Sequence, residues 1–279
     1  MKHISDRSFY KKFKRFLTEG PAEDFSDIID LPVDQFVKRF QSLSQEPEVQ
    51  ALIQAGKKDG NPSDEVIRFT ATSIPVQQLR PTQNEIGMDE SLQSILTDKF
   101  NTVDMILRGG TVKIKGPILV LNDEWIIDGH HRWSQVYVTN PDCKIEAISM
   151  KANIDPLDAL KAVQMAIAAS TNGELPLSKA KGINLLDATV RNVIAYIQKH
   201  ATEKVAKKFF AAKQISQPTI QLLANRIAYN IKMMQSKSQP VDGAPSRSVM
   251  PQTGDAPEFV KHLKQGMVNF IDPKPSDIQ

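Results

Sequence analysis

The spacing of hydrophobic residues divides the chain into two regions with different patterns. Between residues 65 and 150, short runs of aliphatic and β-branched residues alternate with amphipathic stretches. These short runs predict strands at 66–72, 117–121, 124–128 and 144–150. After Pro156 the apolar residues recur at three- and four-residue spacing, and they predict helices at 156–169, 184–200, 202–213 and 217–235. The pattern therefore predicts an α+β fold, with a small mixed-sheet unit followed by an α-helical part.

Further helices are predicted before and inside the sheet unit. In the first 60 residues they fall at 8–18, 33–44 and 47–55. Inside the unit they fall at 89–99 and 102–108, and another begins at His130. Asn122 and Asp123 separate two strands, and this pair favours a tight hairpin turn.

Turn-forming residues predict four segments. Residues 57–64, "KKDGNPSD", mark a break, and residues 236–257 contain four prolines, which indicates a linker or a surface-wrapping loop. The predicted segments are an N-terminal helical segment at 1–60, a sheet domain at 65–152, a basic helical domain at 155–235, and a linker with a C-terminal helix (257–268) and tail at 236–279.

Cysteine content and hydropathy exclude several classes. Cys143 is the only cysteine, so this chain forms no internal disulfide and no thiolate zinc cluster. No run of about 18 apolar residues predicts a membrane span, and the basic N-terminus lacks the apolar core of a secretory signal. We therefore expect a protein of the cytoplasm, with no membrane partner, or one carried inside another particle.

The stretch "IIDGHHRW" at 126–133 carries the candidate chemistry. A strand that ends at Asp128, a glycine at the turn and a helix that starts at His130 outline a phosphate site, because the first N–H groups of a helix favour an anion. Gly129 lets the backbone approach the ligand. Arg132 can bind phosphate oxygens in bidentate fashion, and His130 and His131 can donate hydrogen bonds or move a proton.

A simpler structural interpretation and a zinc site are the alternatives to this phosphate site. Asp128 could cap the helix and leave His130 and His131 as ordinary surface donors. Zinc binding is disfavoured, because adjacent helical positions point about 100° apart and no third ligand lies at a suitable spacing.

The same residues carry a resemblance to a known family. Together with "LRPTQNEIGMDESLQSIL" at 79–96, the Gly-His-His-Arg-Trp loop resembles the ParB/sulfiredoxin superfamily domain over residues 65–150. Gly129, His131 and Arg132 match the Gly-Cys-His-Arg loop of sulfiredoxins, while His130 replaces the catalytic cysteine and so excludes cysteine-based sulfinic acid reduction. Gly129, Arg132 and Trp133 match the ParB loop, and the His-His form is more similar to kinase-like members.

The resemblance implies nucleotide or phosphodiester chemistry. Gly129, His131 and Arg132 would bind the phosphates of ATP or CTP, and Glu85, His130 and His131 would be catalytic. The family's upstream acid corresponds best to Glu85, as a general base or as a Mg²⁺ ligand together with Asp128. For Glu85 the alternative is an ordinary solvated loop acid.

Charge is segregated along the chain, although the formal net charge is only +3. Residues 191–237 hold nine Lys and Arg against one acid, which indicates an anionic partner such as DNA. The side chains predicted to contact DNA phosphates are Lys204, Lys207, Lys208, Lys213 and Arg226. "ISQPTIQLLANRI" at 215–227 resembles the second helix of a helix-turn-helix, whereas Phe209 and Phe210 fit the preceding helix of that motif badly. Plain solvated helices are the alternative.

The N-terminus holds a separate pattern. "FKRFLTEG" at 13–20 is similar to the leader segments of large tailed-phage proteins that are packaged in the head and cut after a Leu-x-Glu sequence. This resemblance implies cleavage after Glu19.

Three functions therefore remain open from the sequence. The first is an enzyme that transfers or hydrolyses a phosphoryl group at residues 128–132. The second is a ParB-like nuclease that uses the same residues. The third is a non-catalytic DNA-binding protein of a phage.

Overall fold

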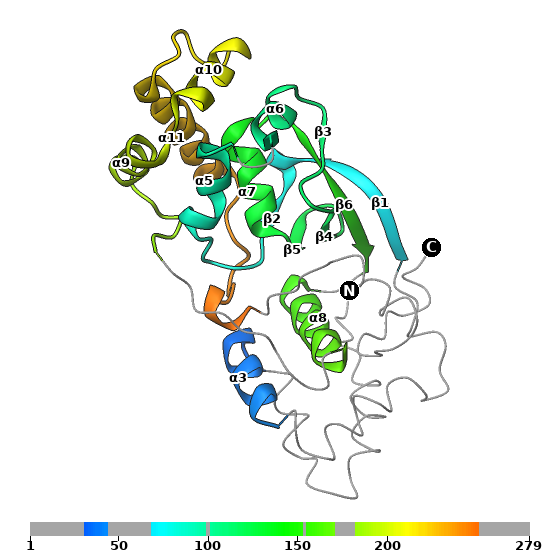
Figure 1. Cartoon of the computed structure of the whole chain (residues 1–279). Coiled ribbons are helices and arrows are strands. Elements are labelled where there is room, and N and C mark those ends of the chain that lie inside the picture. The colour runs from blue at the N-terminus through cyan, green and yellow to red at the C-terminus, as the bar shows by residue number, and fades with distance from the viewer. Residues whose placement is uncertain (1–30, 44–67, 99–100, 153–154, 171–181, 251–279) are drawn as a thin grey trace, which may run out of the picture.

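The computed structural model describes residues 31–43, 68–98, 101–152, 155–170 and 182–250. The helices predicted at 8–18, 47–55 and 257–268 and the cleavage site after Glu19 lie outside these residues. The described part has an α+β fold, in which a mixed sheet is followed by a helical layer (Figure 1). Within it, no helix is both long and apolar enough to cross a lipid bilayer.

The sheet has the strand order β1-β6-β4-β5-β2, and β3 also pairs with β6. Its strands are β1 (Arg68–Pro75), β2 (Arg80–Pro81), β3 (Thr111–Val112), β4 (Ile118–Leu121), β5 (Trp125–Asp128) and β6 (Lys144–Lys151). β1 pairs antiparallel with β6 and β4 pairs antiparallel with β5, whereas β4 and β3 run parallel to β6 and β2 runs parallel to β5. The sheet is therefore mixed, and β5 lies next to its β2 edge.

The β4–β5 hairpin follows the prediction closely. Asn122 and Asp123 have positive φ values of 52° and 62°. A type I′ turn requires positive φ at both central residues, and its twist suits the flanking strands. The strand predicted at 66–72 continues instead to Pro75, and the two-residue strands β2 and β3 were not predicted because they are too short to show a period.

The described helices agree with prediction within three residues, except for one. They are α3 (Val33–Leu43), α5 (Met88–Leu96), α6 (Thr102–Leu107), α7 (His130–Thr139), α8 (Pro156–Ser170), α9 (Val190–His200), α10 (Glu203–Ala211) and α11 (Ile220–Lys237), with short 3₁₀ helices η1 (Val76–Gln78) and η3 (Arg247–Val249).

The start of α9 was predicted wrongly. It begins at Val190, and not at residue 184, with Thr189 as an N-cap whose side chain accepts a hydrogen bond from the Asn192 N–H. Asn184 instead accepts a hydrogen bond from the Ile86 N–H at 2.9 Å, and the Leu185 N–H donates to the Ile86 carbonyl. These long-range bonds draw the segment into the fold as extended backbone before the helix begins.

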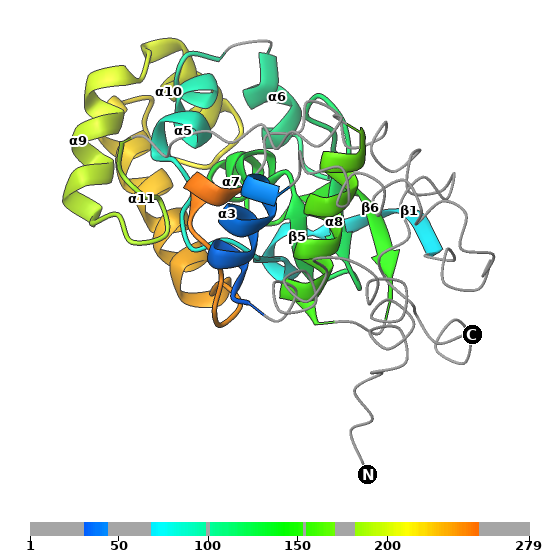
Figure 2. The ribbon, with the colours of Figure 1, turned by 90° about the horizontal axis from the view of Figure 1, so that it is seen from below.

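Helices cover both faces of the sheet (Figure 2). Ile118, Val120 and Ile126 belong to the buried cluster that includes α7, because alternate side chains of a strand point to the same face. Leu119, Leu121 and Ile127 are also buried but lie outside that cluster, on the face that contacts α8. β4 is therefore buried on both faces, and α7 lies between the sheet and the helical layer.

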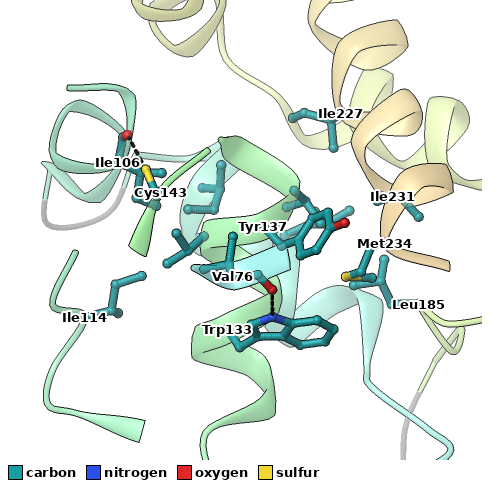
Figure 3. Packing of buried hydrophobic residues seen from close by; sticks show 14 of the residues in the cluster. Val76, Ile106, Ile114, Trp133, Tyr137, Cys143, Leu185, Ile227, Ile231 and Met234 are labelled. Atoms are coloured by element: carbon teal, nitrogen blue, oxygen red, sulfur yellow. Dashed lines mark hydrogen bonds between the residues drawn. The ribbon is translucent and has the colours of Figure 1, made fainter. Parts of the chain in front are cut away.

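The packing of α7 connects the sheet to α11 (Figure 3). The Trp133 indole donates to the Val76 carbonyl at 2.9 Å, and Tyr137 packs edge-on against Trp133. On the other side, the buried Asn230 of α11 donates to the Val138 carbonyl at 2.9 Å. One buried cluster thus contains residues of both predicted segments, 65–152 and 155–235.

Residues 238–250, called the strap below, return from the end of α11 across the segment 80–84. The Val241 N–H donates to the Pro81 carbonyl at 3.1 Å, and the Asn84 N–H donates to the Pro245 carbonyl at 3.0 Å. Val249 and Met250 are buried, and η3 lies beside α3 (Figure 1). This part of the Pro-rich segment is therefore a wrapping loop that belongs to the fold.

Candidate functional site

The turn between β5 and α7 depends on glycine. Gly129 has a φ of 99°, and a Cβ added there would lie 2.4 Å from Ile118 Cγ2. Such a φ is strained for any residue with a side chain, and the space is closed as well. As the N-cap, Gly129 provides no side-chain acceptor for the first N–H groups of α7. The first turn of the helix can therefore present these N–H groups to an anion.

His130 has a different role from the predicted one. It is only 5% exposed, and its Nε2 accepts a hydrogen bond from the Thr82 N–H at 3.2 Å. Burial lowers the pKa of His130 well below its ordinary value, and the neighbouring charges of His131, Arg247 and Arg132 lower it further. As a neutral acceptor inside the fold, His130 joins α7 to the segment after β2, so its prediction as a ligand donor or proton carrier is corrected.

Arg132 turns toward β4. Its Nη2 bonds to Asp128 Oδ2 at 2.6 Å, while its Nη1 donates to the Pro117 and Gly116 carbonyls at 2.9 and 3.2 Å. The predicted phosphate-binding arginine and the predicted metal ligand Asp128 therefore form an ion pair in this structure. To meet a phosphate, the guanidinium has to exchange one of these acceptors for a ligand oxygen.

His131 is the predicted residue with the least satisfied side chain. Its Nε2 is buried and has no hydrogen-bond partner among the described residues. Burial and the charge of Arg247 lower the pKa of His131 to about 4. The imidazole is therefore neutral near pH 7, and Nε2 can donate or accept one hydrogen bond according to its tautomer.

Glu85 lies on the same side of the site. The charges of Glu90, Asp128 and Glu85 all support the protonated form of Arg247, whose pKa burial nevertheless lowers. Arg247 also acts on His131, so the three carboxylates and the histidine all lie within electrostatic reach of one guanidinium. No signal in the sequence indicated Arg247, which stands more than 100 residues from the loop, in a segment that resembles a linker.

The magnesium prediction depends on Glu85 and Asp128. Among the described residues, no three His, Cys, Asp or Glu side chains are grouped closely enough to hold a metal ion by themselves. Mg²⁺ in nucleotide sites is usually held by one or two carboxylates, substrate phosphates and water. The described residues therefore do not fit a resident metal, and a Mg²⁺ at Glu85 and Asp128 would need phosphate and water ligands as well.

A pocket of about 840 Å³ opens along the outer side of α7. It is lined by α5 (Glu90, Ser94), α7 (Gln135), α6 (Met105) and the loop before β4 (Lys113, Lys115). The loop continues into Gly116, whose carbonyl accepts from Arg132, so the pocket begins one residue from that contact. Ser94 Oγ is buried without a partner among the described residues, which leaves a polar atom to be satisfied there.

The predicted nucleic-acid contacts fall into two groups. Lys204 and Lys208 both pair with Asp98, whose side chain is fully buried, and Lys208 also pairs with Asp104. Lys207 and Lys213 are exposed. The prediction for Lys208 is corrected, because its side chain is only 16% exposed and its ammonium pairs with two carboxylates.

The predicted helix-turn-helix differs from that motif in its turn. Residues 212–219 connect α10 to α11, whereas the motif uses three or four residues. Thr219 is the N-cap of α11, and its side chain accepts from the Leu222 N–H at 3.2 Å. Arg226 donates to Gln214 Oε1 at 2.7 Å and lies beside the exposed Tyr229 ring. The two helices therefore form a broader surface than the motif has.

Comparisons with known proteins give no relative: no family model, no curated protein and no solved structure matches this chain.

Proposed function

We propose that this protein binds the phosphates of a nucleoside triphosphate, ATP or CTP with Mg²⁺, at the Gly129 turn, and that it transfers or hydrolyses the terminal phosphoryl group. The observation that carries the proposal is the α7 N-terminus. Its glycine N-cap gives the first N–H groups no side-chain acceptor, and the buried Nε2 of His131 beside them has no hydrogen-bond partner in the part of the chain that the structure describes. ParB/sulfiredoxin-like membership remains a proposal with the same basis.

The neighbouring pocket offers room for the rest of a nucleotide. Its volume of about 840 Å³ lies within the range of ligand sites, and its lining combines Met105 with the polar groups of Ser94 and Gln135. Lys113 and Lys115 in the lining would attract a phosphate chain, whereas Asp89 and Glu90 in the same lining would repel it. Mg²⁺ would offset the repulsion between triphosphate and the nearby carboxylates.

In the proposed reaction, the protein mainly positions groups. Glu85 accepts the proton of an acceptor hydroxyl or water, whose oxygen bonds to the terminal phosphorus. The bond from that phosphorus to the bridging oxygen breaks, and the diphosphate leaves with the electron pair. His131 and the α7 N–H groups stabilise charge on the transferred group.

The test is titration calorimetry of the purified chain with ATP and with CTP, each with Mg²⁺. We expect binding by the wild type, and loss of binding in the double variant His131→Ala/Arg132→Ala. Arg108→Ala is a matched control, because Arg108 is exposed at the end of α6. Equal affinity of the double variant and the wild type would refute the site. Plasmid nicking that requires Mg²⁺ and is lost in Glu85→Ala would favour the nuclease instead.

DNA binding by the basic helical layer is the second candidate function. The observation that favours it is the charge of residues 191–237, nine Lys and Arg against Glu203 alone. Lys207 and Lys213 are exposed, and so are the aromatic rings of Phe210 and Tyr229. Exposed cations bind backbone phosphates without sequence preference, and exposed aromatic rings can stack on unpaired bases.

A further inference from the structure

Arg247 is held beside the N-terminus of α7 by the strap. The segment 82–84 lies between α7 and the strap and is bonded to both. The Thr82 N–H donates to His130 Nε2 of α7, and the Asn84 N–H donates to the Pro245 carbonyl of the strap. Arg247 follows Pro245 by two residues. The strap therefore positions a cation, from near the end of the described residues, at the candidate site.

The strap is anchored on both sides of Arg247. The Ser246 N–H donates to Asp34 Oδ1 of α3 at 3.2 Å, and the Asn84 side-chain amide donates to the Ala244 carbonyl at 2.9 Å. After Arg247, Val249 and Met250 are 4% and 5% exposed. These contacts fix the backbone of Arg247, while its long side chain can exchange one interaction partner for another.

The negative charges near Arg247 belong to carboxylates, which a phosphate can replace. The charges of Glu90, Asp128 and Glu85 act on Arg247 and favour its protonated form, and Asp128 also pairs with Arg132. Arg132 already donates to Asp128, Gly116 and Pro117, and Arg247 also interacts within the fold. Arg247 can bind phosphate oxygens through its planar fork once it exchanges a carboxylate for them. An arriving phosphate competes with carboxylates for both arginines.

We propose that Arg247 contacts the phosphate of the bound ligand, and that this contact couples ligand binding to the strap. This inference rests on the proposed function, since it assigns a further residue to the same site. The ligand class is a compound with two or more linked phosphates. Once Arg132 and Arg247 each exchange an acceptor for a phosphate oxygen, the two forks and the α7 N–H groups provide more donors than one phosphate requires.

The first experiment measures binding of inorganic triphosphate, ATP and CTP, each with Mg²⁺, to the full chain and its variants. We expect Arg247→Ala to weaken binding of all three by roughly 10- to 100-fold, the effect of losing a charge-assisted hydrogen-bond pair. Arg247→Lys keeps the charge but loses the fork, and an intermediate loss is expected. Arg108→Ala controls for the loss of one positive charge at an exposed position.

The second experiment uses the wild type alone, in case Arg247→Ala does not fold. Hydrogen exchange is followed with and without triphosphate, and added protection is expected at residues 246–250 as well as at 130–133. Protection confined to 130–133, or unchanged affinity of a folded Arg247→Ala, would overturn the role of Arg247 and leave the phosphate site standing. If the wild type binds none of the three probes, the proposed function fails and this inference fails with it.

Discussion

At the residue scale, single atoms decide what the β5–α7 turn can do. Gly129 is required both by its φ of 99° and by Ile118, which occupies the space where a Cβ would lie. Its neighbour His130 is a buried acceptor, whereas His131 Nε2 has no hydrogen-bond partner among the residues that the structure describes. Adjacent histidines therefore have different roles, because successive positions of a helix point about 100° apart.

Replacement of Gly129 tests the turn. Gly129→Ala should lower the free energy of unfolding by about 2–4 kcal/mol, from backbone strain together with the contact to Ile118. Gly110→Ala is a matched control, because Gly110 has a φ of 80° and nothing within 4 Å of the added Cβ. Denaturant unfolding of both variants is the measurement. An equal loss in the two would show that the contact with Ile118 contributes nothing.

The two histidines also predict a dependence of stability on pH. Burial holds the pKa of His130 far below its ordinary value and lowers that of His131 to about 4. Below about pH 6.5 the unfolded chain binds protons that the folded chain does not, so stability is full above that pH and falls as the pH decreases. Each histidine should reduce the unfolding free energy by roughly 1.6 kcal/mol in total between pH 6.5 and 5, since the slope approaches about 1.4 kcal/mol per pH unit only well below pH 6.5.

Urea unfolding at pH 7, 6 and 5 measures this effect. His131→Asn should remove roughly half of the decrease, because it removes one of the two groups that titrate differently in the folded and unfolded chain. A wild type that is equally stable at pH 7 and pH 5 contradicts the burial of both neutral imidazoles.

At the element scale, α5, α6 and α10 are joined by an ionic cluster. Asp98 follows α5, has a φ of 54° and a fully buried side chain, and pairs with Lys204 and Lys208 of α10. Burial by itself raises the pKa of Asp98, but the hydrogen bonds and charges of Lys208 and Lys204 outweigh it and leave the pKa below its ordinary value. Lys204 and Lys208, two of the lysines predicted to contact DNA, thus stabilise the packing of the helical layer against the sheet unit.

Asp98→Asn tests the cluster at the element scale. Asparagine tolerates positive φ, so the change removes the charge and keeps the backbone. We expect a loss of about 2 kcal/mol of unfolding free energy, less than the cost of an unpaired buried charge, since Lys208 loses one carboxylate and keeps Asp104. Lys204→Ala is the control and should cost less than about 1 kcal/mol, because its side chain is 64% exposed. Thermal unfolding of the two variants at pH 7 compares them, and equal losses contradict a buried pair.

The helices and strands show how far local patterns reach. The β4–β5 hairpin, α7 and α11 follow from apolar period, turn residues and caps, which act over a few residues. The start of α9 does not, because Asn184 and Leu185 bond to Ile86, about 100 residues away. The sequence likewise left two interpretations of residues 236–257, a linker or a wrapping loop. The hydrogen bonds of the strap with Pro81 and Asn84 depend on tertiary packing, and they show that this part is a wrapping loop.

At the scale of the whole molecule, charge and packing divide the chain differently. The buried cluster runs through the sheet unit and the helical layer alike, whereas positive charge gathers in residues 191–237. Ion pairs within the fold neutralise part of that charge, as Lys208 shows. The surface available to an anionic partner is therefore smaller than the sequence count indicates.

The salt dependence of DNA binding tests this remaining surface. If DNA binds the helical layer, Lys207→Ala/Lys213→Ala should reduce the slope of log affinity against log salt by about 2. Arg108→Ala/Lys144→Ala is the control, because both residues are exposed outside 191–237. Fluorescence anisotropy with labelled DNA measures the slopes, and equal slopes for both double variants contradict binding through α10 and its following loop.

The sequence by itself determined the α+β class, the order of the main strands and helices, and the glycine turn before α7, because each follows from the period and turn chemistry of a few neighbouring residues. Only the tertiary structure decided which groups remain available for chemistry. It joined His130 to Thr82 and Lys208 to Asp98, and it brought Arg247 to His131. Such pairings depend on where distant segments pack, and a local pattern does not encode that.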